Sequence, residues 1–188
     1  RSTVFFDANG NRSPDAGEPS TTTDKSGRFN LQLPASQFDK NGDGRVDSKD
    51  GFIVSLGGID TATGVSIDYP LLAPPTASVV NPVTSIVVSV MESNQNLDES
   101  PASGLVKTSL GIKDNVDVLN FDMFSEASKG NADSVDVIKS AAKLQDSSVQ
   151  ATSIIKGSTE RACLDTSSIT KSLAQKVLNG DTVNLDDS

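Results

Sequence analysis

The chain has 188 residues, long enough to bury a hydrophobic core as one large domain or two small ones. Its formal net charge is −9, so phosphate backbones and anionic lipids would repel it, and we expect no nucleic-acid partner. No apolar run is long enough to cross a bilayer, so we also expect no membrane insertion. The absence of histidine argues against zinc sites and against Ser-His or Cys-His catalysis.

Cysteine usage and the first residues add two further expectations. Cys163 is the single cysteine, so no disulfide can form within the chain. With no histidine to activate it, we expect an inert thiol. The chain begins at Arg1 without the pattern of a signal peptide, and we expect it to be a piece of a longer protein.

The first third of the chain is typical of β-structure. Residues 1–70 are rich in Gly, Asp, Asn and Thr, and turn signals separate five short strand-like runs: "TVFF", "TTTD", "RFNLQL", "FIVSLGG" and "VSIDY". Residues 71–80, "LLAPPTASVV", contain adjacent prolines and are expected to be a connector. We therefore predict a small β-rich region over 1–70.

The spacing of apolar residues becomes helical after the connector. Asn81 is the expected N-cap of a first helix with Pro82 at its first position, and Ser100 and Pro101 repeat this start signal before Gly111. A short helical turn is expected in "FDMFSEASKG", a long helix between Asn131 and Gly157, and a last one from about 165–168 to "NG" at 179–180. The apolar stripes that we assign to core packing are Val83, Ile86, Val87 and Val90; Leu105, Val106 and Leu110; Val137, Ala141, Leu144, Ser148, Ala151 and Ile155; and Ile169, Leu173 and Val177.

These patterns predict an α+β protein, in which a small N-terminal β-rich calcium-loop region precedes a C-terminal antiparallel helical bundle. The expected divisions are a β-rich region at 1–70, a connector at 71–80, the bundle at 81–180 and a linker at 181–188.

The stretch "FDKNGDGRVDSKD" has the spacing of a calcium-binding loop. Calcium takes six to eight oxygen ligands, and a twelve-residue loop supplies them from positions 1, 3, 5, 7, 9 and 12, with glycine at position 6. Those positions hold Asp39, Asn41, Asp43, the Arg45 carbonyl, Asp47 and Asp50, with Gly44 at the turn. The pattern matches the calcium-loop signature except for the closing Asp in place of Glu. A plain solvated turn is the alternative, but a turn has no reason to fill every ligand position together with the glycine.

A second stretch, "FDANGNRSPDAGE", fits the same template less regularly. Its ligand positions hold Asp7, Asn9, Asn11, the Ser13 carbonyl, Asp15 and Glu18, so the long closing acid is present. Position 6 is Arg12, which must take up a left-handed or strained backbone conformation at a cost of about 1 kcal/mol or more. We therefore predict two calcium sites, of which this is the weaker, with a plain hairpin loop as the alternative here. Phe6 and Phe38 precede the two loops, and their rings could anchor them to the core.

The stretch "VFFDANGNRSPDAGEPSTTTDKSGRFNLQLP" resembles the calcium-binding SdrD B-type repeat of bacterial surface proteins, over about residues 3–34. In that repeat a strand runs into a D-x-N-x-N loop, followed by "GEP", a threonine-rich strand, a D-x-x-G turn and an aromatic-bearing strand. The chain departs from it at Arg12, where the repeats usually have glycine, and in lacking the later strands of the full β-sandwich.

The second loop, "DKNGDGRVDSKD", resembles the calcium loop of dockerins, including its terminal Asp. Dockerins need two loop-helix units, whereas the first loop here precedes a strand-like segment, so we do not expect a dockerin. The continuation "LGGIDTATGVSIDYPLLAPPTASVVNPVTSIV" is similar to segments of large, repetitive, secreted or cell-surface bacterial proteins. This likeness implies a module of an extracellular or bacterial cell-surface, adhesin-like protein.

The expected function is a calcium-stabilised structural or adhesive module, in which calcium rigidifies the β-rich part and its junction to the helices. Its expected partners are calcium, neighbouring modules of the same chain and a protein or glycan surface ligand. The alternative is a dockerin-like recognition module, which a helix directly after Asp50 would favour and a strand would not. We do not expect an enzyme, because the acids gather in loops already explained by metal ligation and few aromatic residues could stack on a sugar.

Overall fold

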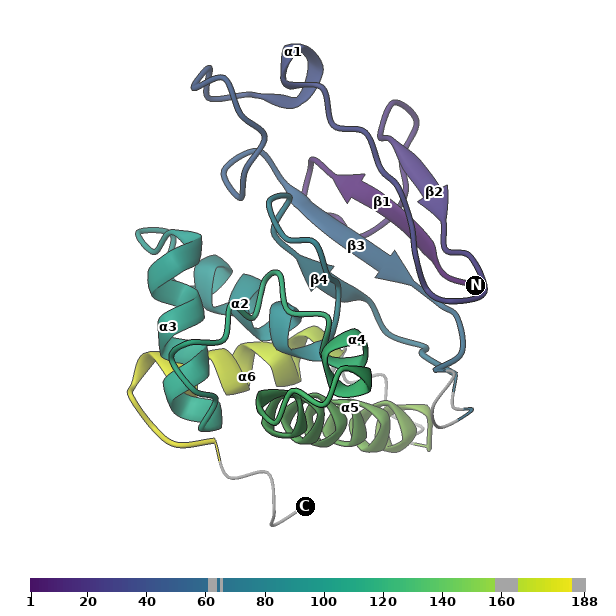
Figure 1. The fold of residues 1–188 in the computed structure, drawn as a ribbon. Coiled ribbons are helices and arrows are strands. Elements are labelled where there is room, and N and C mark those ends of the chain that lie inside the picture. Colours follow the sequence, from purple (N-terminus) through teal and green to yellow (C-terminus); the bar gives the residue numbers. More distant parts are fainter. Residues whose placement is uncertain (61–63, 65, 158–165, 184–188) are drawn as a thin grey trace.

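The computed structural model describes residues 1–60, 64, 66–157 and 166–183, and it confirms the α+β class with a four-stranded antiparallel sheet and six helices (Figure 1). The strands are β1 (Thr3–Asp7), β2 (Ser20–Thr22), β3 (Phe52–Leu56) and β4 (Leu71–Ala73), in the spatial order β2-β1-β3-β4. The central pair is in register from Thr3 opposite Leu56 to Asp7 opposite Phe52. This register places the end of β1 beside the start of β3, where the two candidate loops are attached.

The sheet buries both of its faces because apolar residues occupy consecutive positions, and successive side chains point to opposite sides. Phe5, Val54 and Leu72 face the helices and belong to the main hydrophobic core. The outer face carries Val4, Phe6, Ile53 and Ala73, which form a second, smaller core. Helices therefore cover one face of the sheet, while loops and an extended segment cover the other.

Helix α2 (Pro82–Ser93) is the central helix of the main core. The Asn81 side chain accepts hydrogen bonds from the backbone N–H of Val83 and Thr84, and Thr84 Oγ1 accepts one from the Asn81 N–H, which makes a capping box as well as the predicted N-cap. Every residue from Val83 to Met91 is buried, because this helix contacts β4, α3, α5 and α6. The predicted stripe is thus only part of its buried surface.

The remaining helices follow the predicted order. They are α3 (Glu99–Leu110), α4 (Met123–Ser128), α5 (Asp133–Gly157) and α6 (Thr166–Leu178). Gly111 ends α3 in the left-handed conformation, with φ 66°. Of the predicted α5 stripe, Val137, Ala141, Leu144 and Ser148 are buried, while the side chains of Ala151 and Ile155 lie outside the described part. No helix in the described ranges combines the length and apolar character needed to cross a bilayer.

Several details differ from the sequence predictions, and one is the start of α3, whose N-cap is Asp98 rather than Ser100. The run "RFNLQL" is extended but pairs with no strand, and α1 (Ala35–Phe38), a single helical turn, follows it. Leu71–Ala73 belong to β4 rather than to a connector, because their apolar side chains complete the sheet. Of the expected strand at 65–69, the described residues 66–69 contribute an isolated bridge between Ser66 and Ile59 rather than a strand. In the expected linker, Val183 packs against the core, and its N–H donates to the Ser109 carbonyl. Cys163 lies outside the described residues.

Candidate metal centre

The loop from Asp39 to Asp50 closes on itself through its own carboxylates. Asp39 Oδ1 and Oδ2 accept the N–H of Gly42 and Gly44 at 2.6 and 2.7 Å. Asp50 Oδ1 and Oδ2 accept the N–H of Lys40 and Asp47 at 2.7 and 2.9 Å. The first and last acids of the loop thus each accept two backbone N–H groups of the same turn.

The loop from Asp7 to Glu18 uses the same bonds at the same positions. Asp7 accepts from Gly10 and Arg12, as Asp39 does from Gly42 and Gly44. Glu18 accepts from Ala8 and Asp15, as Asp50 does from Lys40 and Asp47.

The inner positions of the two loops correspond in the same way. Position 3 accepts from the N–H of position 5 in both loops, and position 5 accepts from that of position 7. The residues concerned are Asn9, Asn11 and Ser13 in the first loop and Asn41, Asp43 and Arg45 in the second. Two stretches that share few residues outside the ligand positions therefore adopt one hydrogen-bonding frame.

The frame includes a left-handed residue at position 6 in both loops. Gly44 has φ 89° there, and Arg12 has φ 59°. Arg12 is the one non-glycine residue with positive φ among the described residues. An arginine in this conformation is strained, as predicted from the sequence, so the first loop keeps its shape at a local energetic cost.

Apolar residues fasten both loops to the outer core. The rings of Phe6 and Phe38 meet edge to face with their centroids 5.5 Å apart, so the residues that precede the two loops pack on each other. Val46, at position 8 of the second loop, also packs against this core. The expected anchoring role of the two phenylalanines is thus seen as a direct contact.

The two loops meet where β1 ends and β3 begins. Asp7 and Asp50 are 2% and 1% exposed, so the first ligand position of one loop and the last of the other are both buried. Between them lies Gly51, where an added Cβ would approach the Asp7 carbonyl oxygen to 2.4 Å. The Lys40 ammonium donates to the backbone carbonyls of Ala8 and Asp50 and thereby links the loops.

Both loops also contact the corner between α2 and α3. Arg12 forms a two-pronged ion pair with Glu92 near the end of α2, with Nη2 at 3.0 and 2.7 Å from the two carboxylate oxygens. In the second loop, the Ser48 N–H donates to Glu99 Oε1 at 3.3 Å, at the first position of α3. The strained arginine is therefore the first loop's link to the helices.

Hydrogen bonds favour the charged form of two candidate ligands. Side-chain hydrogen bonds from Asn9 and then Asn11 lower the pKa of Asp15 below its usual value. Burial raises the pKa of Asp50, but hydrogen bonds from the backbone N–H groups of Asp47, Lys40 and Asn41 outweigh it, so its pKa is also lowered. Both side chains are carboxylates at neutral pH, the form that a hard cation requires.

The donor set is suited to calcium rather than to a transition metal. Each loop combines carboxylates with amide oxygens and one backbone carbonyl, all hard oxygen ligands. Within the described ranges, no three acidic, cysteine or histidine side chains converge on a common point in the manner of a preformed metal cluster. The loops place their acids around the backbone frame, and amide and carbonyl oxygens would complete a coordination shell.

The sequence predicted the candidate ligand positions but gave no sign of the residues that join the loops. A lysine at position 2 and a glycine after position 12 have no distinctive spacing, so nothing marked Lys40 or Gly51. The partner of Arg12 lies 80 residues away, beyond the reach of any local pattern. No protein-family model, curated protein or solved structure matches this chain.

Proposed function

We propose that the chain is a calcium-binding structural module of a secreted or surface-attached bacterial protein. Calcium in the two loops would stiffen the β-rich part and its junction to the helices, which we take to form an antiparallel bundle. Neighbouring modules of the same chain and a protein or glycan surface ligand are its proposed partners.

The observation that carries this proposal is the shared frame of the two loops. Both have oxygen-bearing side chains at positions 1, 3, 5, 9 and 12 of a twelve-residue loop, and both use the same backbone hydrogen bonds. Calcium would neutralise the repulsion among these acids, which otherwise opposes their close approach. The second loop, with glycine at position 6, is the stronger proposed site.

The calcium concentration and the dissociation constant together determine how much calcium binding would raise the free energy of unfolding. Calcium sites in extracellular modules have dissociation constants of about 10⁻⁴–10⁻³ M, which millimolar calcium would fill. With free calcium about tenfold above the dissociation constant, each site adds about 1.4 kcal/mol to the free energy of unfolding, and two independent sites add about 2.8 kcal/mol. That is a large part of the stability of a typical domain.

Thermal unfolding with and without a chelator tests the structural role. We expect chelation to lower the melting temperature by about 5 °C or more and to open residues 1–60 to a protease before the helices. Magnesium at the same concentration is the control, because its strict octahedral geometry fits a flexible oxygen loop poorly. A melting temperature that stays the same in chelator and in calcium would contradict the proposal.

A dockerin-like recognition module is the second candidate. Its distinguishing feature would be a helix directly after Asp50, and β3 follows there instead. Capture of a surface protein from the parent organism in calcium, and its loss in chelator, would favour this candidate over a purely structural role.

A further inference from the structure

The segment Phe29–Leu33 covers the outer face of the sheet as an unpaired strand. Phe29, Leu31 and Leu33 are half-buried against the outer core, and Asn30 and Gln32 between them are exposed. This alternation is that of a β-strand with one face on the core. None of these five residues makes a hydrogen bond through its backbone to any described residue.

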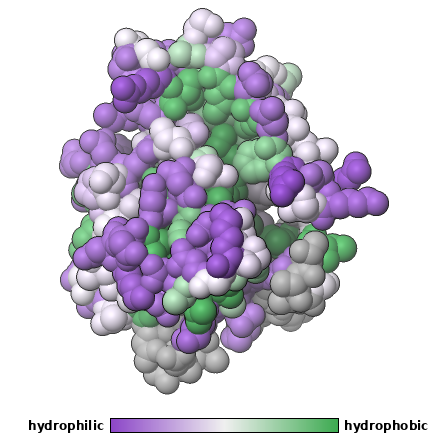
Figure 2. Space-filling view, viewed as in Figure 1, coloured by the Kyte–Doolittle hydropathy of each residue, from purple (hydrophilic) through white to green (hydrophobic). Residues whose placement is uncertain are grey.

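Backbone N–H and C=O groups that are removed from water need a hydrogen-bonding partner, and leaving them without one costs free energy. The segment runs from the turn at residues 24–28 up to α1 (Figure 1) and is not paired with any strand of the sheet. Phe29, Leu31 and Leu33 keep part of their surface in solvent, and Figure 2 shows hydrophobic residues open to solvent in the upper part of the molecule. A strand laid beside this segment would satisfy its backbone and cover more of this apolar surface.

The charge at the start of the segment indicates which strand would fit. Arg1, Lys25 and Arg28 are exposed there, and none of them forms a salt bridge with a described residue. Arg1, Arg28, Phe29 and Asn30 help to line an open hollow at this end. Asp24 lines the same hollow; its carboxylate accepts hydrogen bonds from the backbone of its own turn and keeps its negative charge beside Arg28. Three basic side chains against one carboxylate leave a local excess of positive charge in a chain whose net charge is −9.

We infer that residues 29–33 are a docking site for an extended, acidic segment of another polypeptide, which adds to them as a β-strand. Main-chain hydrogen bonds give the affinity, alternate apolar side chains cover the exposed parts of Phe29, Leu31 and Leu33, and acidic residues at one end meet Arg28 and its neighbours. This inference goes beyond the calcium role. A second copy of the chain fits less well, because two molecules of this net charge repel each other.

The test uses an end-capped synthetic peptide of alternating valine and threonine with two acidic residues at each end. Acidic residues can then meet Arg28 whether the peptide binds parallel or antiparallel to the segment. Hydrogen exchange read by mass spectrometry on the whole chain, in calcium-containing buffer, reports the amides of residues 29–33. We expect fast exchange in the free protein and at least about tenfold slower exchange with the peptide bound.

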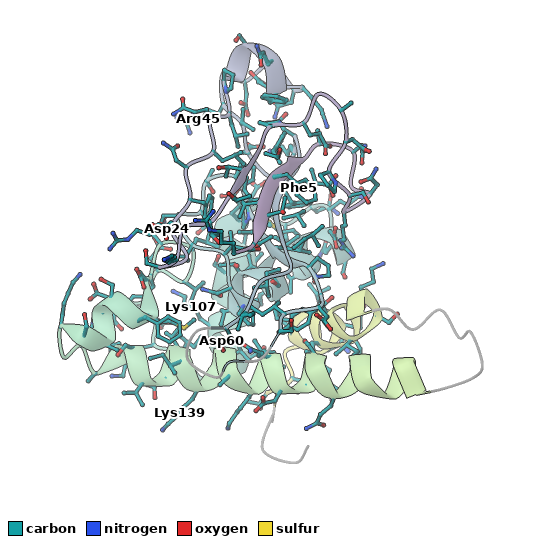
Figure 3. The ribbon with its side chains drawn as sticks, turned by 90° about the vertical axis from the view of Figure 1, so that its right-hand side faces the viewer. Phe5, Asp24, Arg45, Asp60, Lys107 and Lys139 are labelled. Carbon is teal, nitrogen blue, oxygen red and sulfur yellow. The ribbon has the colours of Figure 1, made fainter. Side chains whose placement is uncertain are left out.

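Fluorescence anisotropy of the labelled peptide measures its affinity for the unmodified chain and for two matched variants. Arg28→Glu is expected to weaken binding roughly fivefold to tenfold. Lys139→Glu makes the same change of charge on α5, where Lys139 is exposed and far from the segment, and is expected to bind like the unmodified chain (Figure 3). A peptide with lysine in place of the acids should bind more weakly than the acidic one.

Three results would overturn the inference. The first is an absence of protection at residues 29–33 with peptide at millimolar concentration. The second is equal binding of the acidic and lysine peptides, or equal effects of Arg28→Glu and Lys139→Glu. The third is protection of the segment that rises with protein concentration in the absence of peptide, which would assign the site to a second copy of the chain.

Discussion

Tyr69 is the single tyrosine of the chain, so its ionisation can be followed without interference. Burial, followed by the negative charges of Asp146 and Asp60, raises its pKa to about 12. Because the folded-state pKa lies above the unfolded value of ~10, the contribution of Tyr69 to stability is complete below pH ~10 and is lost as the pH rises toward 12. A spectroscopic titration of tyrosinate should give a midpoint near 12 in the folded protein and near ~10 in denaturant.

The hydroxyl group of Tyr69 gives a second prediction at this scale. It is buried and has no hydrogen-bond partner among the described residues. Replacing Tyr69 with phenylalanine removes this unsatisfied group while keeping the ring, so we expect the free energy of unfolding to rise by about 1 kcal/mol. Denaturant unfolding measures the change, and a loss of stability in Tyr69→Phe would show that the hydroxyl has a partner.

Gly51 tests the close contact between the two loops. An added Cβ would lie 2.4 Å from the Asp7 carbonyl oxygen and 2.8 Å from the Phe6 ring. We therefore expect Gly51→Ala to lower the free energy of unfolding by about 1–3 kcal/mol. Gly104→Ala in α3 is the control, since a Cβ there meets no atom within 4 Å, and it should be neutral or stabilising by up to about 1 kcal/mol. Equal effects of the two changes would mean that the loops are not tightly apposed.

At the scale of elements, the Arg12–Glu92 ion pair connects the first loop to α2. The two side chains are 21% and 25% exposed, so the pair is only partly screened, and a coupling energy of about 1 kcal/mol is expected. A double-mutant cycle with Arg12→Ala and Glu92→Ala measures it. The same cycle on Lys49 and Asp98, which are 60% and 74% exposed, is the control and should give about 0 kcal/mol. A coupling at Arg12–Glu92 no larger than the control would remove this link between loop and helix.

Elements with local signals were predictable from the sequence. Asn81 with Pro82 marked the start of α2, and Gly111 marked the end of α3, because capping depends on residues that are adjacent in the chain. The segment Phe29–Leu33 shows where such signals fail. Its alternation predicted a strand, and its side chains do alternate, but pairing also needs a neighbouring backbone, and the sequence does not report whether one is near.

The candidate site also contains some features that the sequence predicted and others that it did not. The oxygen-bearing positions of both loops could be read from spacing, because the twelve-residue frame is local. Lys40, Gly51 and the Arg12–Glu92 pair could not, since each depends on contacts between segments that are distant in the chain. The strain at Arg12 was predicted from its position in the loop, while its connection to α2 was found only in the fold.

At the scale of the whole molecule, the sheet and the helices share one main core. Phe5 and Val54 from the sheet belong to the same hydrophobic core as buried residues of α2 and α6, so the predicted boundary between a β-rich region and a helical region is not a boundary between separate cores. The candidate loops lie at the edge of this unit and contact the corner between α2 and α3. Ordering the loops would therefore also fix the position of that corner.

The central claim is that these two loops bind calcium, and isothermal titration calorimetry of calcium into the whole chain tests it most directly. We predict two sites in the unmodified protein, one site in Asp39→Ala and one in Asp7→Ala, with the tighter site lost in Asp39→Ala. Circular dichroism of the two variants checks that each remains folded. An unmodified, folded protein that binds no calcium at millimolar concentration would contradict the account.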